Sequence, residues 1–332
     1  KQKTAYEMLR SLVGSEMCIR DRGYTPEGPM FEICIQHGIS PMTMNSAHRD
    51  NALILKRYGK NNADMHPVSL SDESWQKLKL MTWSEVNWHT VRDEIEDCYY
   101  SGQWYGEVAT QFNTKLINSE ALKLKLGLDS KKRTVLLFPH IFWDATFFWG
   151  DDLFDDYETW FNECVRIAWE TPSVNWVIKI HPANLVKNIR DGKSPEFSEM
   201  KVINKFGEIP SHIHIIPAET DISTLSLYSI GDVCLTVRGT VGIEAAAYGL
   251  LVITSGTGRY DRLGFTTDVE TQGDYFKLLS NIANLPSPTE SQIELARRYA
   301  YGVFIKRPLE MHSINFSYSK TRDAKLEVSI SK

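Results

Sequence analysis

Several features that would commit a chain of 332 residues to a special environment are missing here. No run of about 18 apolar residues occurs, which argues against a transmembrane helix. The five cysteines are scattered and lack C-x-x-C spacing, so neither a disulfide framework nor a cysteine zinc site is expected. The formal net charge is −5, whereas a nucleic-acid-binding surface needs an excess of basic residues. We therefore expect a cytoplasmic protein that does not bind nucleic acid.

The short motifs of metal and nucleotide chemistry are also absent. No H-E-x-x-H or comparable spacing occurs, so we predict no metal site. There is no P-loop and no G-x-S-x-G, and no helical pattern follows the G-x-G at Gly256 to Gly258. What is present is an apolar share of 42% beside a charged share of 24%, which favours a packed core over disorder.

The second half of the chain alternates short apolar runs with helical patterns. Buried strands are expected over residues 134–138, 176–180, 213–216, 233–237 and 251–254. Helices are expected over residues 119–126, 155–169, 223–229, 240–248, 274–282 and 289–301. Short apolar strands that alternate with helices indicate parallel βαβ units, so the predicted fold class is α/β with a parallel sheet.

The first half reads differently. One short strand is expected at residues 39–44, and helices are expected at 29–37, 45–58, 72–80 and 84–99. The helix over 45–58 rests on Asn45 or Ser46 as its N-cap and on the apolar residues from Ala52 to Leu55 as its buried face.

Polar residues follow the predicted strands at the points where the strands end. Open parallel sheets bind ligands beyond the carboxyl ends of their strands, so these residues are the candidate site. For each of them a structural role, such as a cap or a satisfied histidine, stays open. Lys179 lies inside a strand and is expected to point to a face of the sheet. The candidates are His140, Asp144, His181, Arg238, Gly239, Thr240, Glu244, Ser255 and Tyr260.

The run Arg238-Gly239-Thr240 is the strongest of these signals. It puts a glycine and a hydroxyl at the start of a helix, where unpaired N–H groups and the helix dipole attract an anion. A phosphate cradle is one interpretation, and a plain N-cap with a packing glycine is the other. His181 can donate to a phosphate or sugar oxygen, and Glu244 can accept from a ribose hydroxyl.

Acid–base chemistry has two further candidate positions. Glu27 lies before the first predicted helix, where it could take the proton of a sugar hydroxyl or serve as an ordinary first-turn acid. His140 and Asp144 stand four residues apart, which allows an acid-orienting pair or an ordinary loop contact. Glu27 and His181 are the predicted catalytic residues.

Four short segments of the second half form a recognisable set: Ile180-His181-Pro182, Gly239 to Glu244, Gly249 to Ile253, and Gly258 to Thr266. With Tyr24 to Gly28 and His48-Arg49-Asp50 in the first half, they resemble bacterial glycosyltransferases that make capsule and other surface polysaccharides. The resemblance implies the GT-B architecture, which has two Rossmann-like lobes with parallel sheets and the active site between them.

Polysialyltransferases and teichoic-acid glycerophosphotransferases, which are related, hold the nucleotide phosphate with a His-Pro motif and a paired-hydroxyl motif. His181-Pro182 is similar to the first, and Thr240 to one member of the second, where Gly239 replaces the other hydroxyl. Pro26-Glu27-Gly28 keeps one of the two acids in the polysialyltransferase base motif. We predict a donor site of His181, Arg238, Gly239, Thr240, Glu244, Ser255 and Tyr260.

The resemblance implies an enzyme that transfers a sugar from a nucleotide-activated donor to a growing polysaccharide or lipid-linked acceptor, with no cofactor. A sugar-nucleotide 2-epimerase or a glycerophosphotransferase of the same fold stays open, as does a non-catalytic subunit that binds sugar nucleotides. Such an enzyme is expected in the cytoplasm or at the inner face of the cell membrane, in peripheral association with a membrane-bound biosynthetic complex.

The expected domain limits complete this outline. Residues 1–22 resemble a translated sequencing adapter and are expected to lie outside the fold. Residues 23–117 would form a truncated N-terminal acceptor lobe, residues 118–312 the lobe that binds the nucleotide sugar, and residues 313–332 a loose tail.

Overall fold

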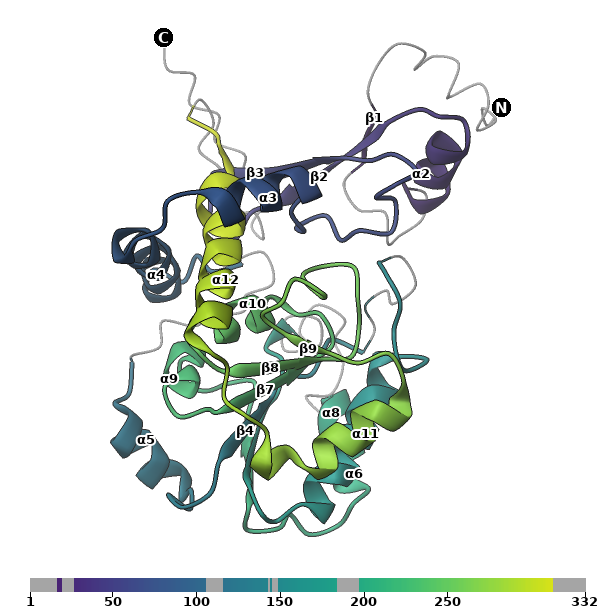
Figure 1. Cartoon of the computed structure of the whole chain (residues 1–332). Helices are drawn as coiled ribbons and strands as arrows, with labels where there is room; N and C mark the ends of the chain where they lie inside the picture. Colours follow the sequence, from purple (N-terminus) through teal and green to yellow (C-terminus); the bar gives the residue numbers. More distant parts are fainter. Residues whose placement is uncertain are drawn as a thin grey trace.

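The computed structural model describes residues 17–19, 27–105, 116–142, 144, 149–183 and 197–312. Figure 1 shows a smaller lobe that contains the first strands and a larger lobe that contains most of the second half of the chain. The predicted loose tail, most of segment 1–22 and residues 24–26 lie outside the described residues. None of the described helices combines the length and the apolarity needed to cross a membrane.

A six-stranded sheet forms the centre of the larger lobe. All of its neighbouring strands pair in parallel, as the alternation of strands and helices predicts. The edge strand β9 escapes prediction because two residues, Thr and Asp, carry no apolar pattern. The strands are β4 (Thr134–Leu137), β5 (Asn175–Lys179), β6 (Ile213–Ile216), β7 (Val233–Thr236), β8 (Leu251–Thr254) and β9 (Thr267–Asp268), in the order β6-β5-β4-β7-β8-β9.

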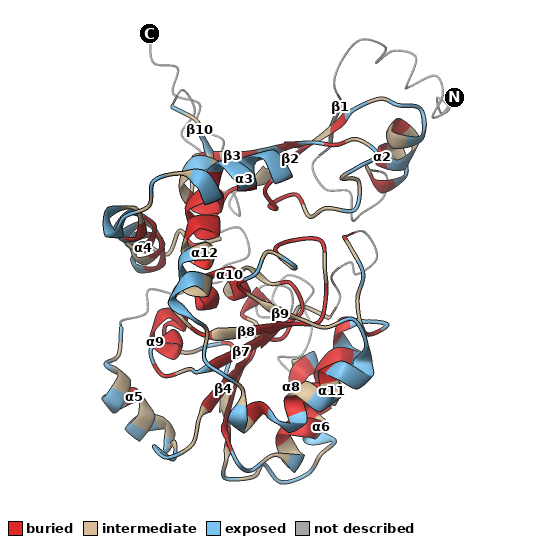
Figure 2. Ribbon diagram, viewed as in Figure 1, coloured by how far each residue is buried: buried red, intermediate tan, exposed pale blue. Residues whose placement is uncertain are grey.

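Helices cover both faces of this sheet. Val135 and Leu137 of β4 pack into the cluster that holds α6, α8 and α11, whereas Leu136 packs into the cluster that holds α9, α10 and α12. Side chains alternate across a strand, so the sheet is buried on both sides, as its red strands in Figure 2 show. The helices are α5 (Ser119–Leu126), α6 (Tyr157–Glu170), α8 (Ser198–Asn204), α9 (Thr224–Tyr228), α10 (Thr240–Ala247), α11 (Gln272–Ser280), η2 (Ile282–Asn284) and α12 (Glu290–Tyr301).

The smaller lobe is built on a mixed sheet. β1 pairs with β2 in parallel, but the β2–β3 and β3–β10 pairs are antiparallel, so this sheet departs from the expected parallel arrangement. β1 falls within the segment 1–22, whose place outside the fold stays a prediction. The elements are β1 (Met17–Ile19), α2 (Glu27–Gln36), β2 (Pro41–Ser46), β3 (Ala52–Arg57), α3 (Asp72–Leu80), α4 (Glu85–Tyr100) and β10 (Leu309–Glu310).

The predicted helix over residues 45–58 is wrong, because residues 52–57 form β3. Burial alternates along this strand, with Ala52, Ile54 and Lys56 buried and the residues between them more exposed. Asn51 turns the chain before the strand, with a left-handed φ of 57°. The run Ala-Leu-Ile-Leu suits a buried helix face as well as a strand, and pairing with β2 decides between them.

The last described part of the chain returns to the smaller lobe. α12 packs on α10 of the larger lobe and on α3 and α4 of the smaller one. It continues into a π-helical turn, η3 (Gly302–Lys306), and β10 then pairs with β3, with Leu309 opposite Leu53. The predicted lobe boundary at residues 117 and 118 stays a prediction, but β10 adds its strand to the first sheet.

Candidate functional site

A cavity of about 250 Å³ lies at the carboxyl edge of the large sheet, against the smaller lobe. The residues that follow β4, β5 and β7 and the first turns of α10 form one wall. The smaller lobe contributes His66, which precedes α3, Tyr99 in the last turn of α4, and Trp104 and Tyr105 just after that helix. This is the position at which open parallel sheets bind ligands.

Most residues predicted from the post-strand pattern line this one cavity. They are His140, Asp144, His181, Arg238, Gly239, Thr240 and Glu244. Bringing them together required the strand order of the sheet, since β4, β5 and β7 are adjacent in space and distant in sequence. The roles assigned to these residues stay predictions.

The predicted residues Glu27, Ser255 and Tyr260 do not line the cavity. Glu27 is the first residue of α2, which lies at the opposite end of the smaller lobe from α4 in Figure 1. Ser255 is buried, and its carbonyl accepts the Leu153 N–H at 3.0 Å, so its backbone holds a neighbouring loop on the sheet.

Tyr260 supports the start of α10 from behind the cavity wall. Its hydroxyl donates to the Gly239 carbonyl at 2.7 Å. A Cβ on Gly242 would lie 2.1 Å from that hydroxyl oxygen, and one on Gly239 would lie 2.9 Å from Thr236 Oγ1. Both glycines are therefore needed for packing. The predicted anion cradle is compatible with this role, because Gly239 and Thr240 also line the cavity.

The three histidines of the cavity wall are neutral rings that each keep one N–H to donate. Nδ1 of His181 and Nδ1 of His66 each accept the backbone N–H two residues further on, at 3.1 Å, so their protons are on Nε2. Nε2 of His140 accepts the Arg238 backbone N–H at 3.1 Å, which leaves its proton on Nδ1. Burial lowers the pKa of His181 to about 3, and burial with nearby cations holds the pKa of the other two well below the usual range.

Lys179 also lines the cavity, so the expectation that it points away from the crevice is wrong. Its side chain is 7% exposed and has no hydrogen bond or ion pair within the described part of the chain. Burial lowers the pKa of its ammonium to about 8, which leaves it mostly charged at neutral pH.

Two buried arginines line the same cavity. Arg238 is 3% exposed and pairs with Asp152, yet its Nε and Nη1 atoms have no hydrogen-bond partner among the described residues. Arg259 donates to Thr240 Oγ1 at 2.6 Å and to the Arg238 carbonyl at 3.1 Å, and its Nε also lacks such a partner. Buried donors without partners cost free energy, so this wall is suited to an anion that supplies acceptors.

Glu244 is fully buried and links the two lobes. Its Oε2 accepts the Tyr99 hydroxyl from α4 at 2.6 Å and the Tyr228 hydroxyl from α9 at 3.1 Å. Its Oε1 has no hydrogen-bond partner of good geometry in the described part of the chain, although the Trp104 indole lies close enough to favour the charged form. Burial outweighs these donors and raises the pKa of Glu244 to about 7.

Sequence reasoning misses part of the cavity wall. Arg259 lies in the Gly-Arg-Tyr-Asp loop after β8, and this position after a strand was the only sequence feature that could have suggested it as a site residue. His66, Tyr99 and Trp104 come from the smaller lobe and carry no motif that points to a site. Tyr105 also carries no sequence motif, but in the structure its backbone φ of 45° is unusual for a bulky residue and marks it as a candidate site residue.

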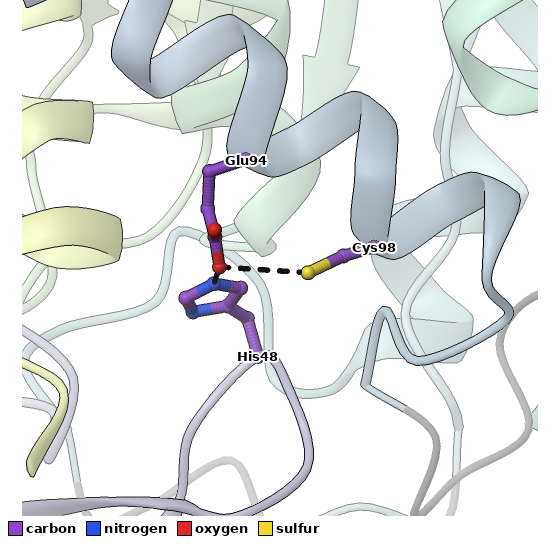
Figure 3. A group of neighbouring side chains, drawn as sticks. All are labelled: His48, Glu94 and Cys98. Carbon is purple, nitrogen blue, oxygen red and sulfur yellow. Dashed lines mark hydrogen bonds and ion pairs between the residues drawn. The ribbon is translucent and has the colours of Figure 1, made fainter. Parts of the chain in front are cut away.

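His48, Glu94 and Cys98 form a second cluster, in which potential metal-ligand atoms lie within 4.8 Å of one another (Figure 3). Glu94 Oε1 lies 2.7 Å from His48 Nε2 and 3.5 Å from Cys98 Sγ. Arg49 donates to both carboxylate oxygens at 3.0 Å. Burial and Glu94 raise the pKa of Cys98, so its thiol stays protonated and donates to the Glu94 carboxylate. We therefore interpret the cluster as a hydrogen-bonded link between α4 and the turn before β3.

The fold and the cavity together define a two-lobed α/β protein of GT-B-like architecture with buried cations between its lobes. The chain is similar to the solved structure of Thermosulfurimonas dismutans KpsC described as a beta Kdo 2,7 transferase, at 12% identity and a TM-score of 0.50, over 93% of this chain and 83% of that one. The KpsC beta Kdo 2,4 transferase of the same organism gives 14% identity and a TM-score of 0.47, over 83% and 76%.

A UDP-GlcNAc 2-epimerase from Neisseria meningitidis bound to UDP-GlcNAc is similar over 55% of this chain and 44% of its own length, at 16% identity and a TM-score of 0.33. No protein-family model and no curated protein matches the sequence. The structural likeness agrees with the GT-B-like fold predicted from the sequence, and at these identities it extends to the fold alone.

Proposed function

We propose that the chain binds a nucleotide-activated sugar in the cavity and transfers the sugar to a polysaccharide or lipid-linked acceptor. The observation that supports this most directly is that Lys179, Arg238 and Arg259 line one cavity together with three neutral histidines and the start of α10. A phosphate of the donor would provide acceptor oxygens for both sets of groups. The acceptor would be met in the cytoplasm, beside a membrane-bound biosynthetic complex.

In this proposal the three cations neutralise the donor phosphate and His181 donates to one of its oxygens. The N–H groups at the start of α10 add the positive end of the helix dipole. Negative charge grows on the leaving phosphate as the bond to the sugar breaks, and the same fixed donors stabilise that charge. Glu244 Oε1 would accept from a ribose hydroxyl.

A base for the acceptor hydroxyl must come from a carboxylate, because each cavity histidine already uses its lone pair to accept a backbone N–H. Asp144 lines the cavity and is the better placed candidate, since Glu244 is engaged by two tyrosines. The sequence predicted Glu27 as the base, but Glu27 lies in α2 and does not line the cavity. This position favours a second candidate function, in which the chain binds the donor without transferring the sugar.

Calorimetric titration with UDP-, CMP- and GDP-linked sugars tests donor binding. We expect one class to bind, and we expect Lys179→Met and Arg238→Met each to weaken that binding by roughly tenfold or more, since each removes a buried charged donor. The matched control is Lys125→Met, which alters an exposed lysine paired with Asp221 and should leave affinity unchanged. Failure of all three classes to bind would reject the proposal.

A turnover assay then separates the candidate reactions. Nucleotide release that depends on an added acceptor supports transfer, and binding without turnover supports the second candidate. Conversion of free UDP-N-acetylglucosamine without an acceptor would instead identify an epimerase. Full turnover in His181→Ala would contradict the role given to that imidazole.

A further inference from the structure

A groove separate from the cavity lies among β3, α3 and the π-helical turn after α12. Its volume is about 510 Å³, within the range of roughly 300–1,000 Å³ that ligand sites occupy. Ser69 lines the groove and His66 lines the cavity, so the short segment that contains them separates the two spaces.

The charged side chains that line this groove are all positive. They are Lys56, Arg57, Lys77, Lys306 and Arg307, and no acidic side chain among the described residues lines it. Lys77 pairs with Glu73 at 2.6 Å, and that carboxylate lies outside the lining. The whole chain has a net charge of −5, so this concentration of positive charge is local.

Arg307 is a built-in part of the groove. Its guanidinium donates to the backbone carbonyls of Ser69, Pro67 and Leu55, the last two at 2.6 and 3.5 Å. Burial lowers the pKa of this arginine. Carbonyls satisfy its N–H groups without the full negative charge of a carboxylate, so its positive charge remains available to a ligand.

Neutral hydrogen-bonding groups lie among the cations. Asn62, Ser69, Ser71 and Ser74 line the same groove. Such side chains suit the hydroxyl groups of a sugar, and the cations suit carboxylate or phosphate groups carried on it. The apolar side chains of the lining are Leu55, Leu70 and Leu78, which can pack against the carbon faces of sugar rings.

We propose that this groove binds an acidic oligosaccharide, a saccharide chain that carries carboxylate or phosphate groups. The ligand would be the acceptor of the sugar transfer, so this part of the proposal rests on the proposed function. Binding of the oligosaccharide in the groove does not require sugar transfer, so the groove and the proposed function can be tested separately.

Calorimetric titration with tetragalacturonate, which has a carboxylate on every ring, tests the groove, with maltotetraose as the neutral probe. We expect tetragalacturonate to bind and to bind more weakly as salt rises from about 20 to about 200 mM, because screening weakens charge pairs. Maltotetraose is expected to bind at least roughly tenfold more weakly, since it offers no charge to the cations. Lys306→Glu should weaken tetragalacturonate binding by about fivefold or more.

The matched control is Lys79→Glu, which makes the same change at an exposed residue of α3 outside the groove and should leave affinity unchanged. Lys306→Gln serves in place of Lys306→Glu if the charge reversal prevents folding. Equal affinity for the two probes, or an equal loss in Lys79→Glu, would overturn the proposal.

The donor cavity provides the internal comparison. Lys179→Met should weaken nucleotide-sugar binding and leave tetragalacturonate binding unchanged, and Lys306→Glu should do the reverse. A protein that binds tetragalacturonate in the groove but no nucleotide sugar would reject the proposed function and leave the groove assignment in place. A protein that binds nucleotide sugars alone would reject the groove.

Discussion

The Glu244 carboxyl is held away from water in the wall between the two lobes. Desolvation raises its pKa to about 7, against the donors from Tyr99 and Tyr228 that favour the charged form. A carboxyl whose pKa is raised on folding is protonated in the folded protein at a pH where the unfolded chain has released the proton. The free energy of unfolding must then fall as pH rises through that window.

We predict that this titration can be measured with Glu244→Gln, which keeps the shape of the side chain and removes the charge. Between pH 4.5 and 7, the unfolding free energy of the wild-type protein should fall by up to about 3 kcal/mol more than that of the variant. Urea unfolding at a series of pH values measures both. Glu120→Gln, at an exposed site, is the control and should run parallel to the wild type. A constant gap between wild type and Glu244→Gln would show that Glu244 does not titrate there.

Individual residues differ in how far the sequence could place them. His181 and Thr240 follow strands, and the rule that ligands bind at strand ends brought both to the cavity. Lys179 was misplaced because it is the last residue of β5, where alternation assigns a side chain to a face although the strand is already ending. Glu27 carried a motif-based role, and no local pattern could reveal its distance from the cavity.

At the scale of elements, the contact between α10 and the loop that carries Tyr260 sets the geometry of the cavity wall. Gly242 lies in α10, where alanine would ordinarily favour the helix. Here a Cβ would stand 2.1 Å from the Tyr260 hydroxyl and 2.8 Å from its ring. Packing therefore overrides helix propensity at this position.

We predict that Gly242→Ala destabilises the protein by roughly 1–3 kcal/mol, because the ring of a buried tyrosine must move. Gly273→Ala in α11 is the matched control, since its new Cβ would meet nothing closer than Thr271 Oγ1 at 3.7 Å and should be neutral or stabilising. Guanidinium unfolding measures both variants. Gly242→Ala should cost less stability in a Tyr260→Phe background than in the wild type, and an equal cost in both would mean that the clash is not with the hydroxyl.

Whole elements of the larger lobe were predicted well because their signals are local. Its long apolar strands and capped helices have the expected positions. β3 was mistaken for a helix because four apolar residues in a row satisfy either period. Its identity depends on β2 and β10, which are brought to it by the rest of the fold.

At the scale of the whole molecule, the two lobes share α12. Arg298 on this helix donates to the carbonyls of Leu78 and Met81 at the end of α3, at 2.7 and 2.8 Å. Tyr299 donates to the Arg259 carbonyl in the larger lobe at 2.6 Å. Two neighbouring side chains of α12 thus form hydrogen bonds to different lobes. Unfolding of α12 would therefore remove contacts from both lobes at once.

We predict a single unfolding transition for the two lobes, visible in calorimetry as equal calorimetric and van't Hoff enthalpies. Arg298→Met should lower the temperature of that one transition, because it leaves carbonyls of α3 without donors. Arg166→Met, which removes a partly exposed arginine paired with Glu163 and Glu170, is the control and should change the midpoint little. Two resolved transitions would contradict the shared role of α12.

The sequence by itself determined the α/β class, the polar residues that follow the strands, and the strands and helices of the larger lobe other than β9 and α8. These depend on periodicity, capping and glycine placement over a few neighbouring residues, so they can be read along the chain. The tertiary structure decided which of those residues share a cavity, which residues of the smaller lobe close it, and how burial sets their charge. Such properties depend on contacts between residues far apart in sequence and on the removal of water, and neither leaves a local pattern.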